Sequence, residues 1–265
     1  MKTRIAILVF LFFSVFLFAQ TNKIVRQEWS KTYSYQDSIY NSPTAIDVNG
    51  NVYVTGFTYS AATAADITTL KYDSLGNLLW SKTYTGQGSN RDHATGICFG
   101  SNGNIYVTGF TLNTSNNYDY IVIKYSPTGT ELWTVIYDNG LHDIPRDIKA
   151  DDSGNIYVTG ESMGTNGRDY ATIKYDQNGN QVWIKRLDNG MDDYASAMEI
   201  DNSGNIIVTG RSYIYDLDIV TVKYKYDGSL IYQLTYSSLS HDDDWASDIV
   251  ADDNDNVYVT GFSTD

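Results

Sequence analysis

Aspartates recur at regular intervals along the chain, and their spacing would place one carboxylate in each copy of a repeated unit. Neighbouring members stand 51, 50 and 51 residues apart, and each lies five residues before an apolar residue of a short strand-like run. Carboxylate oxygens are the ligands that Ca²⁺ prefers, so carboxylates repeated around an axis could line a cation-binding mouth. The four positions are Asp92, Asp143, Asp193 and Asp244.

The same aspartates have a structural alternative. Short acidic side chains readily accept hydrogen bonds from the backbone amides of their own loop. A ligand site needs only a few donor atoms, so the presence of the aspartate in every copy favours this structural role. Trp245 follows Asp244 directly, and an aromatic ring can stack on a sugar. We predict ligand contacts at the four aspartates and Trp245 and no cofactor, Ca²⁺ being the one that their chemistry would admit.

The remaining chemistry-bearing residues do not form a catalytic constellation. His93, His142 and His241 lie at different registers of equivalent loops, and Cys98 is the one cysteine of the chain. The sequence contains no G-x-S-x-G elbow, no P-loop and no H-E-x-x-H pair. We therefore predict no catalytic residue, and the sequence leans away from an enzyme.

The segments that carry these residues are copies of one unit of about 51 residues. A hexapeptide N-(I/V)-(Y/I)-V-T-G begins at positions 51, 104, 155, 205 and 256, and a D-x-x-x-x-K-Y run follows the first four copies. The complete units span residues 41–84, 92–137, 143–187 and 193–236, a partial unit spans 244–265, and a lone strand spans 28–33.

Each complete unit contains four short runs rich in β-branched and aromatic residues, which suit half-buried strands. Tight turns with Asp, Asn and Gly, such as residues 152–155 and 176–180, join the first run to the second and the third to the fourth. Longer stretches make the other connections. The pattern predicts an all-β fold of four-stranded antiparallel sheets, with tight turns at one edge and long loops at the other, which we call the long-loop face.

A four-stranded unit of this length has the size of a β-propeller blade. The repeated unit resembles the bacterial SBBP-type β-propeller repeat, in which D-x-A-x-x-I is followed by a tight turn and then by N-I-Y-V-T-G. Residues 193–210 are a close example. The resemblance covers essentially all of residues 28–265 and implies about seven blades. We therefore expect the four complete units and the partial terminal blade to be a fragment of a larger propeller.

Two further patterns predict contacts between blades. The third run carries an aspartate and a lysine five residues apart, as at Asp119 and Lys124. Residues five apart lie on opposite faces of a strand, so each is predicted to bond across strands or blades. In addition, D-x-x-G-x-x-x-W at residues 73–80 and 176–183 is similar to the tryptophan-docking motif of quinoprotein propellers, where the motif is structural. The flanking N-x-Y-V-T-G does not belong to that pattern.

The first twenty residues have the layout of a secretory signal peptide. Two basic residues precede an uncharged, mostly apolar run of 14 residues, and Ala19 supplies a small residue for cleavage. The run is shorter than the ~20 residues that a membrane-spanning helix needs. We expect residues 1–20 to be removed and residues 21–265 to form the propeller domain without a membrane span. The protein would then be secreted or lie at the cell surface or in the periplasm.

The charge balance and the fold narrow the function. With 32 acidic and 18 basic side chains, the net charge is −14. Phosphate backbones repel such a chain, which argues against a nucleic-acid partner. A propeller is a scaffold shared by many functions. We predict a binding or structural scaffold whose long-loop face contacts a protein, a glycan or a cation. The alternative is the propeller domain of an exported polysaccharide-acting hydrolase or lyase.

Overall fold

The described part of the chain consists of strands and the turns and loops that join them. The computed structural model describes residues 43–59, 65–87, 91–213, 216–238 and 243–263. The predicted leader, the lone strand at 28–33 and His241 lie outside these residues. Within them, no helix is long and apolar enough to cross a membrane.

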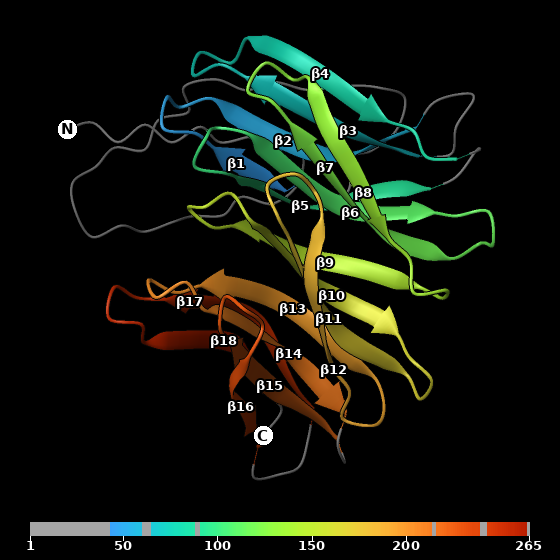
Figure 1. The fold of residues 1–265 in the computed structure, drawn as a ribbon, viewed down its shortest axis with the longest axis vertical. Helices are drawn as coiled ribbons and strands as arrows, with labels where there is room; N and C mark the ends of the chain where they lie inside the picture. The colour runs from blue at the N-terminus through green and yellow to red at the C-terminus, as the bar shows by residue number, and fades with distance from the viewer. Residues whose placement is uncertain (1–42, 60–64, 88–90, 214–215, 239–242, 264–265) are drawn as a thin grey trace.

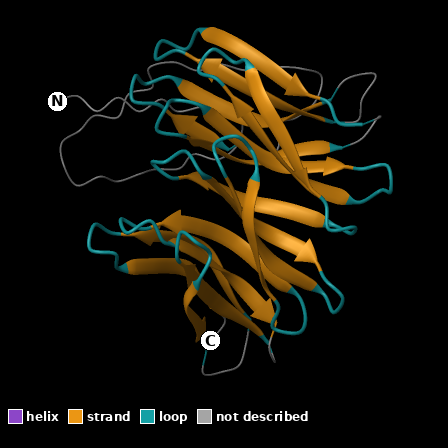
Figure 2. Cartoon of the chain, in the orientation of Figure 1, coloured by secondary structure: helices purple, strands orange, loops and turns teal. Residues whose placement is uncertain are grey.

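The strands form four antiparallel sheets of four strands and one sheet of two, which confirms the all-β prediction (Figure 2). Within each sheet, the strands lie side by side in chain order. The blades are β1–β4 (Thr44–Ile46, Val52–Thr58, Asp66–Tyr72, Leu78–Tyr84), β5–β8 (Asp92–Phe99, Ile105–Leu112, Tyr118–Tyr125, Glu131–Tyr137), β9–β12 (Asp143–Ala150, Ile156–Met163, Arg168–Tyr175, Gln181–Leu187), β13–β16 (Asp193–Ile200, Ile206–Tyr213, Leu217–Tyr224, Leu230–Tyr236) and β17–β18 (Asp244–Ala251, Val257–Ser263).

Most of the tight turns are stabilised by the side chain of their first residue. Between β9 and β10, Asp151 accepts hydrogen bonds from the backbone N–H and the side-chain amide of Asn155 at 2.9 and 2.8 Å. Gly154 has a φ of 80°, in the left-handed region that glycine adopts at no steric cost. The D-x-x-G-N pattern therefore specifies the hairpin by its own chemistry.

The blades are arranged one after another along an arc (Figure 1). The first strands of neighbouring blades contact each other, as β5 does β9 and β13 does β17. The fourth strands instead carry exposed apolar residues such as Leu132 and Leu234. The first strand is therefore the innermost of each blade and the fourth the outermost. The first and fifth blades lie at opposite ends of the arc, so the described residues form an open arc (Figure 1).

The apolar core lies between the blades. One cluster joins Tyr106 and Val122 of the second blade to Ile148 and Val158 of the third. Similar clusters join the first blade to the second and the third to the fourth. The repeated tyrosines of the first three second strands, Tyr53, Tyr106 and Tyr157, are buried in these clusters as packing residues of the repeat.

The predicted contacts of the strand-three lysines are confirmed. Lys124 Nζ donates to the backbone carbonyl of Gln177 in the next blade at 2.7 Å. Equivalent bonds join Lys71 to Pro127 and Lys174 to Tyr226. Lys223 instead pairs across strands of its own blade with Asp201, at 2.6 Å. These lysines therefore stabilise the blades and their order along the arc.

Candidate functional site

The four repeated aspartates are the first residues of β5, β9, β13 and β17, at the long-loop face, and they are almost completely buried. In each, Oδ2 accepts a hydrogen bond from a backbone amide of the preceding loop. Asp143, for example, accepts from the N–H of Asn139 at 2.8 Å. This geometry is that of the structural alternative, because each aspartate fixes its own loop. Direct ligand contact by these four side chains stays a prediction.

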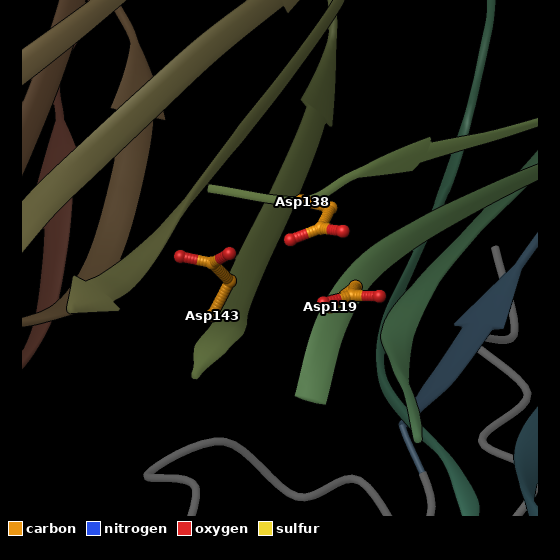
Figure 3. Close-up of side chains that lie close together, drawn as sticks. All are labelled: Asp119, Asp138 and Asp143. Carbon is orange, nitrogen blue, oxygen red and sulfur yellow. The ribbon is translucent and has the colours of Figure 1, made fainter. Parts of the chain in front are cut away.

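Two of these aspartates also belong to clusters of three carboxylates between neighbouring blades. Asp143 lies near Asp119 and Asp138, with one carboxylate oxygen of each within 4.8 Å of the others. The three side chains come from the start of β9, the start of β7 and the loop after β8 (Figure 3). The equivalent cluster one blade further along consists of Asp169, Asp188 and Asp193. Either cluster offers the oxygen ligands that Ca²⁺ prefers.

The first cluster holds its negative charge at an energetic cost. Burial, together with the charges of Asp138 and Asp143, raises the pKa of Asp119 to about 6 against the opposing hydrogen bond from Asn113. The Asn113 amide donates to both oxygens of Asp119, at 3.1 and 3.0 Å. Burial also raises the pKa of Asp143. A proton or a cation among these carboxylates would relieve their repulsion.

Arg186 distinguishes the second cluster from the first. Its guanidinium donates from Nε to Asp169 at 2.9 Å and also bonds the hydroxyl of Ser162. Burial still raises the pKa of Asp193 to about 6. Among the described residues, no lysine or arginine forms an ion pair with the first cluster. The first cluster is therefore the better candidate for a bound cation.

A row of side chains follows the inner strands just inside the long-loop face. Its members occupy two repeat positions, the residue after the repeated aspartate and the residue after V-T-G. Tyr194 on β13 pairs in register with Arg211 on β14. Trp245 occupies on β17 the position that Tyr194 occupies on β13. The Arg211 guanidinium lies 4.4 Å from the ring centre of Tyr194 and 4.5 Å from that of Trp245. This rim row consists of Phe57, His93, Phe110, Ile144, Glu161, Tyr194, Arg211, Trp245 and Phe262.

In the first two blades the rim row is a stack of rings. Phe57 and His93 are stacked with ring centres 3.9 Å apart, and His93 lies 4.9 Å from Phe110. Ring contacts continue from Phe110 to Tyr118 and from Tyr118 to His142, at 4.8 and 5.2 Å. The last two residues border a cavity of about 400 Å³, lined by Arg91, Leu112, Asn116, Tyr118 and His142.

Trp245 is the predicted site residue that the rim row contains, and 42% of its surface is exposed. Sequence reasoning missed the other members, although the repeat carried a signal for them. The residue after V-T-G reads Phe, Phe, Glu, Arg and Phe through the five copies, while V-T-G itself does not vary. A position that differs from copy to copy can specialise, and its residues range from the buried Phe57 and Glu161 to the exposed Phe262.

Non-repeated polar residues on the inner strands link neighbouring blades. Lys149 pairs with Glu199 at 3.3 Å, and Asp147 accepts a hydrogen bond from the N–H of Met198 at 2.9 Å. Burial raises the pKa of the nearby Cys98 thiol. The thiol is therefore neutral near pH 7 and not an activated nucleophile. In this structure, these polar groups and the Cys98 thiol have structural roles.

Comparison with known proteins bears on the fold. No curated protein matches the chain. Two solved structures match with a TM-score of 0.54 at 10% identity. One is a protein of unknown function from Dyadobacter fermentans, with 84% of this chain and 74% of that chain covered. The other is a polysaccharide lyase, an ulvan lyase bound to -[GlcA(1-4)Rha3S]-, with 89% and 67% covered.

A further solved structure, a eukaryotic initiation factor, gives a TM-score of 0.41 at 10% identity, with 75% of this chain covered. The chain spans 55% of the length of that protein. The family described as a beta-propeller repeat, SBBP, matches residues 138–168, which cover the loop before the third blade and its strands β9 and β10. The chain thus carries the SBBP β-propeller repeat.

Proposed function

We propose that the chain is an exported β-propeller binding module whose long-loop face contacts its ligand through the rim row. The observation that carries this proposal is the contact series from Tyr194 through Arg211 to Trp245, which crosses from the fourth blade to the fifth. Residues at two variable repeat positions form one row, whereas the residues that repeat are used for packing and turns. A binding surface has this division of labour.

The rim row suits a polar ligand with flat apolar faces. Aromatic rings supply large contact areas at little cost in side-chain entropy, and arginine supplies directional donors. A glycan or a polar peptide has both kinds of group. The buried aspartates contribute indirectly in this proposal, because they fix the loops that surround the row.

The second candidate is the propeller domain of an exported polysaccharide-acting hydrolase or lyase. One structurally similar protein is a polysaccharide lyase, which makes this candidate worth testing, but a likeness at 10% identity extends to the fold alone. The inner-strand polar groups that such an enzyme would use are engaged in links between blades, as Lys149 is with Glu199. That engagement favours binding over catalysis.

The test is a binding screen of the full chain against glycan and peptide arrays, with one rim-row variant, one variant of the ring that contacts Phe110 of that row, and one surface control. Trp245→Ala and Tyr118→Ala are expected to weaken the binding that the wild-type chain shows. Leu132→Ala removes an exposed apolar side chain of the outer strand β8 and is expected to leave binding unchanged. Absence of binding to every probe, or equal losses in all three variants, would overturn the proposal. Release of new chain ends from a bound polysaccharide would favour the enzyme candidate.

A further inference from the structure

Arg211 differs in its partners from the three arginines of the third blade. Arg146, Arg168 and Arg186 each pair with a carboxylate, at 2.8, 3.5 and 2.5 Å. Arg211 forms no ion pair with a described carboxylate, and its Nε is buried without an acceptor among the described residues. An unpaired guanidinium is unusual in a chain with a net charge of −14, since acceptors are abundant.

The nearest acid is already engaged. Asp192 accepts hydrogen bonds from the backbone N–H of Arg168 at 2.9 Å and from the Tyr194 hydroxyl at 2.9 Å. Arg168 also donates to the Tyr194 hydroxyl at 3.0 Å. This network fixes the Tyr194 ring. The Arg211 guanidinium lies 4.4 and 4.5 Å from the ring centres of Tyr194 and Trp245, and its charge also acts on Asp192, but no ion pair joins it to a described carboxylate. The side chain is pre-positioned, and its hydrogen-bonding capacity is left for an external acceptor.

We propose that Arg211, between the rings of Tyr194 and Trp245, binds the carboxylate of a uronic acid unit in an acidic oligosaccharide. The inference rests on the proposed binding function and names its ligand class. A guanidinium presents two parallel N–H donors to a planar carboxylate, a match that a neutral sugar cannot make. The exposed ring of Trp245 offers a face on which a pyranose ring stacks. A uronate has the anion and the flat apolar face in one unit.

The overall negative charge of the protein is compatible with such a ligand. At physiological ionic strength, exposed charges more than about 8 Å apart are largely screened from each other. A short uronate chain also carries one charge per sugar, far fewer than a nucleic acid of equal length. The local charge at the rim row, where Arg168 and Arg211 lie beside Asp192, therefore decides whether an acidic oligosaccharide binds.

The experiment is calorimetric titration of the full chain with galacturonate, glucuronate and mannuronate trisaccharides, each against its neutral hexose counterpart. At least one uronate is expected to bind at least tenfold more tightly than its neutral counterpart. Arg211→Gln is expected to abolish that preference, because it removes the charge and the fork while keeping a polar side chain. Lys225→Gln, at the opposite edge of the same blade, removes an equal charge and should leave the preference intact.

Separate outcomes test the inference and the proposed function. Equal affinity for acidic and neutral sugars, or an unchanged preference in Arg211→Gln, overturns the uronate assignment. If Trp245→Ala still weakens binding in that case, the binding function stands. A hexaglutamate peptide that binds while all three uronates fail would also overturn the assignment and point to an acidic peptide instead. Circular dichroism melting of each variant confirms that the losses do not come from unfolding.

Discussion

Trp133 in the second blade donates its indole N–H to the backbone carbonyl of Gln177 in the third blade, at 3.1 Å. Lys124 donates to the same carbonyl at 2.7 Å. The same double contact recurs at two other blade interfaces, with Lys71 and Trp80 on Pro127 and with Lys174 and Trp183 on Tyr226. One turn carbonyl thus receives two donors from the preceding blade and joins the blades at their tight-turn edge.

Trp133→Phe tests how much the indole N–H of this contact contributes to the stability of the fold. The variant keeps an aromatic ring but loses the N–H, while Lys124 still satisfies the carbonyl. We therefore expect a loss of about 1 kcal/mol in the free energy of unfolding, the usual worth of one hydrogen bond. Chemical denaturation should show a lower midpoint at an unchanged slope. The loss should be non-additive with Lys124→Met, because both donors share one acceptor. Additive losses would contradict the shared contact.

Gly129→Ala tests how closely the tryptophan approaches the turn of the next blade. A Cβ at Gly129 would stand 2.9 Å from Trp80 Cδ2, and the residue has a φ of 83°. Gly204, with a φ of 76°, has nothing within 4 Å of such a Cβ. Gly204→Ala therefore measures the backbone strain alone, about 1–2 kcal/mol. We expect Gly129→Ala to lower the unfolding midpoint clearly more than the control. Equal losses would show that the Trp80 ring moves aside freely.

The blades could be predicted from the sequence because each one is specified locally. The V-T-G strands and the alternation of short runs recur in every copy and the turn aspartates in most of them, so the copies reinforce each interpretation. The aspartate clusters were half predicted. Asp143 and Asp193 were predicted as ligand contacts from their repeat position, but Asp119 joins Asp143 because the start of a third strand lies beside the next blade, which only the stacking of blades reveals.

The rim row could not be predicted for a different reason. Arg211 meets Trp245 across a blade interface, 34 positions apart in the sequence, and neither residue repeats in the other copies. A contact between two variable positions leaves no pattern within one sequence. The alignment of copies could mark both positions as variable, but not as neighbours.

Asp119→Asn tests the energetic cost of the carboxylate cluster through pH. The pKa of Asp119 is raised to about 6 from an ordinary value of 3.8, mainly by burial. The folded state therefore holds this proton more tightly than the unfolded state, so the contribution of Asp119 to stability falls as pH rises from about 4 through 6. At pH 7.5 the asparagine variant is expected to melt above the wild type, and at pH 4 the two should melt together. A higher melting temperature of the wild type at pH 7.5 would contradict the conclusion that the charged form of Asp119 destabilises the fold.

Bound Ca²⁺ is also expected to reduce the repulsion among the carboxylates of the first cluster. Because no described arginine forms an ion pair with Asp119, Asp138 or Asp143, as Arg186 does with Asp169, a divalent cation is expected to stabilise this cluster more than the second one. Millimolar Ca²⁺ at pH 7.5 should raise the melting temperature, and Asp138→Asn should reduce the rise more than Asp188→Asn does. A melting temperature that is the same with chelator and with calcium would remove the metal from consideration.

Asp92→Ala tests whether the repeated aspartates hold the long loops. Asp92 accepts hydrogen bonds from the N–H of Gly86 at 2.7 Å and from the Thr111 hydroxyl at 2.6 Å. Its loss leaves both donors without their acceptor in a buried site, which we expect to cost about 2–3 kcal/mol. Hydrogen exchange at the Gly86 amide should accelerate by more than the global change in stability allows. Asp152→Ala, in an exposed tight turn, should change neither quantity. If Asp92→Ala left the Gly86 amide protected, the loop would be held by other contacts, and the repetition of this aspartate in four blades would need a ligand to explain it.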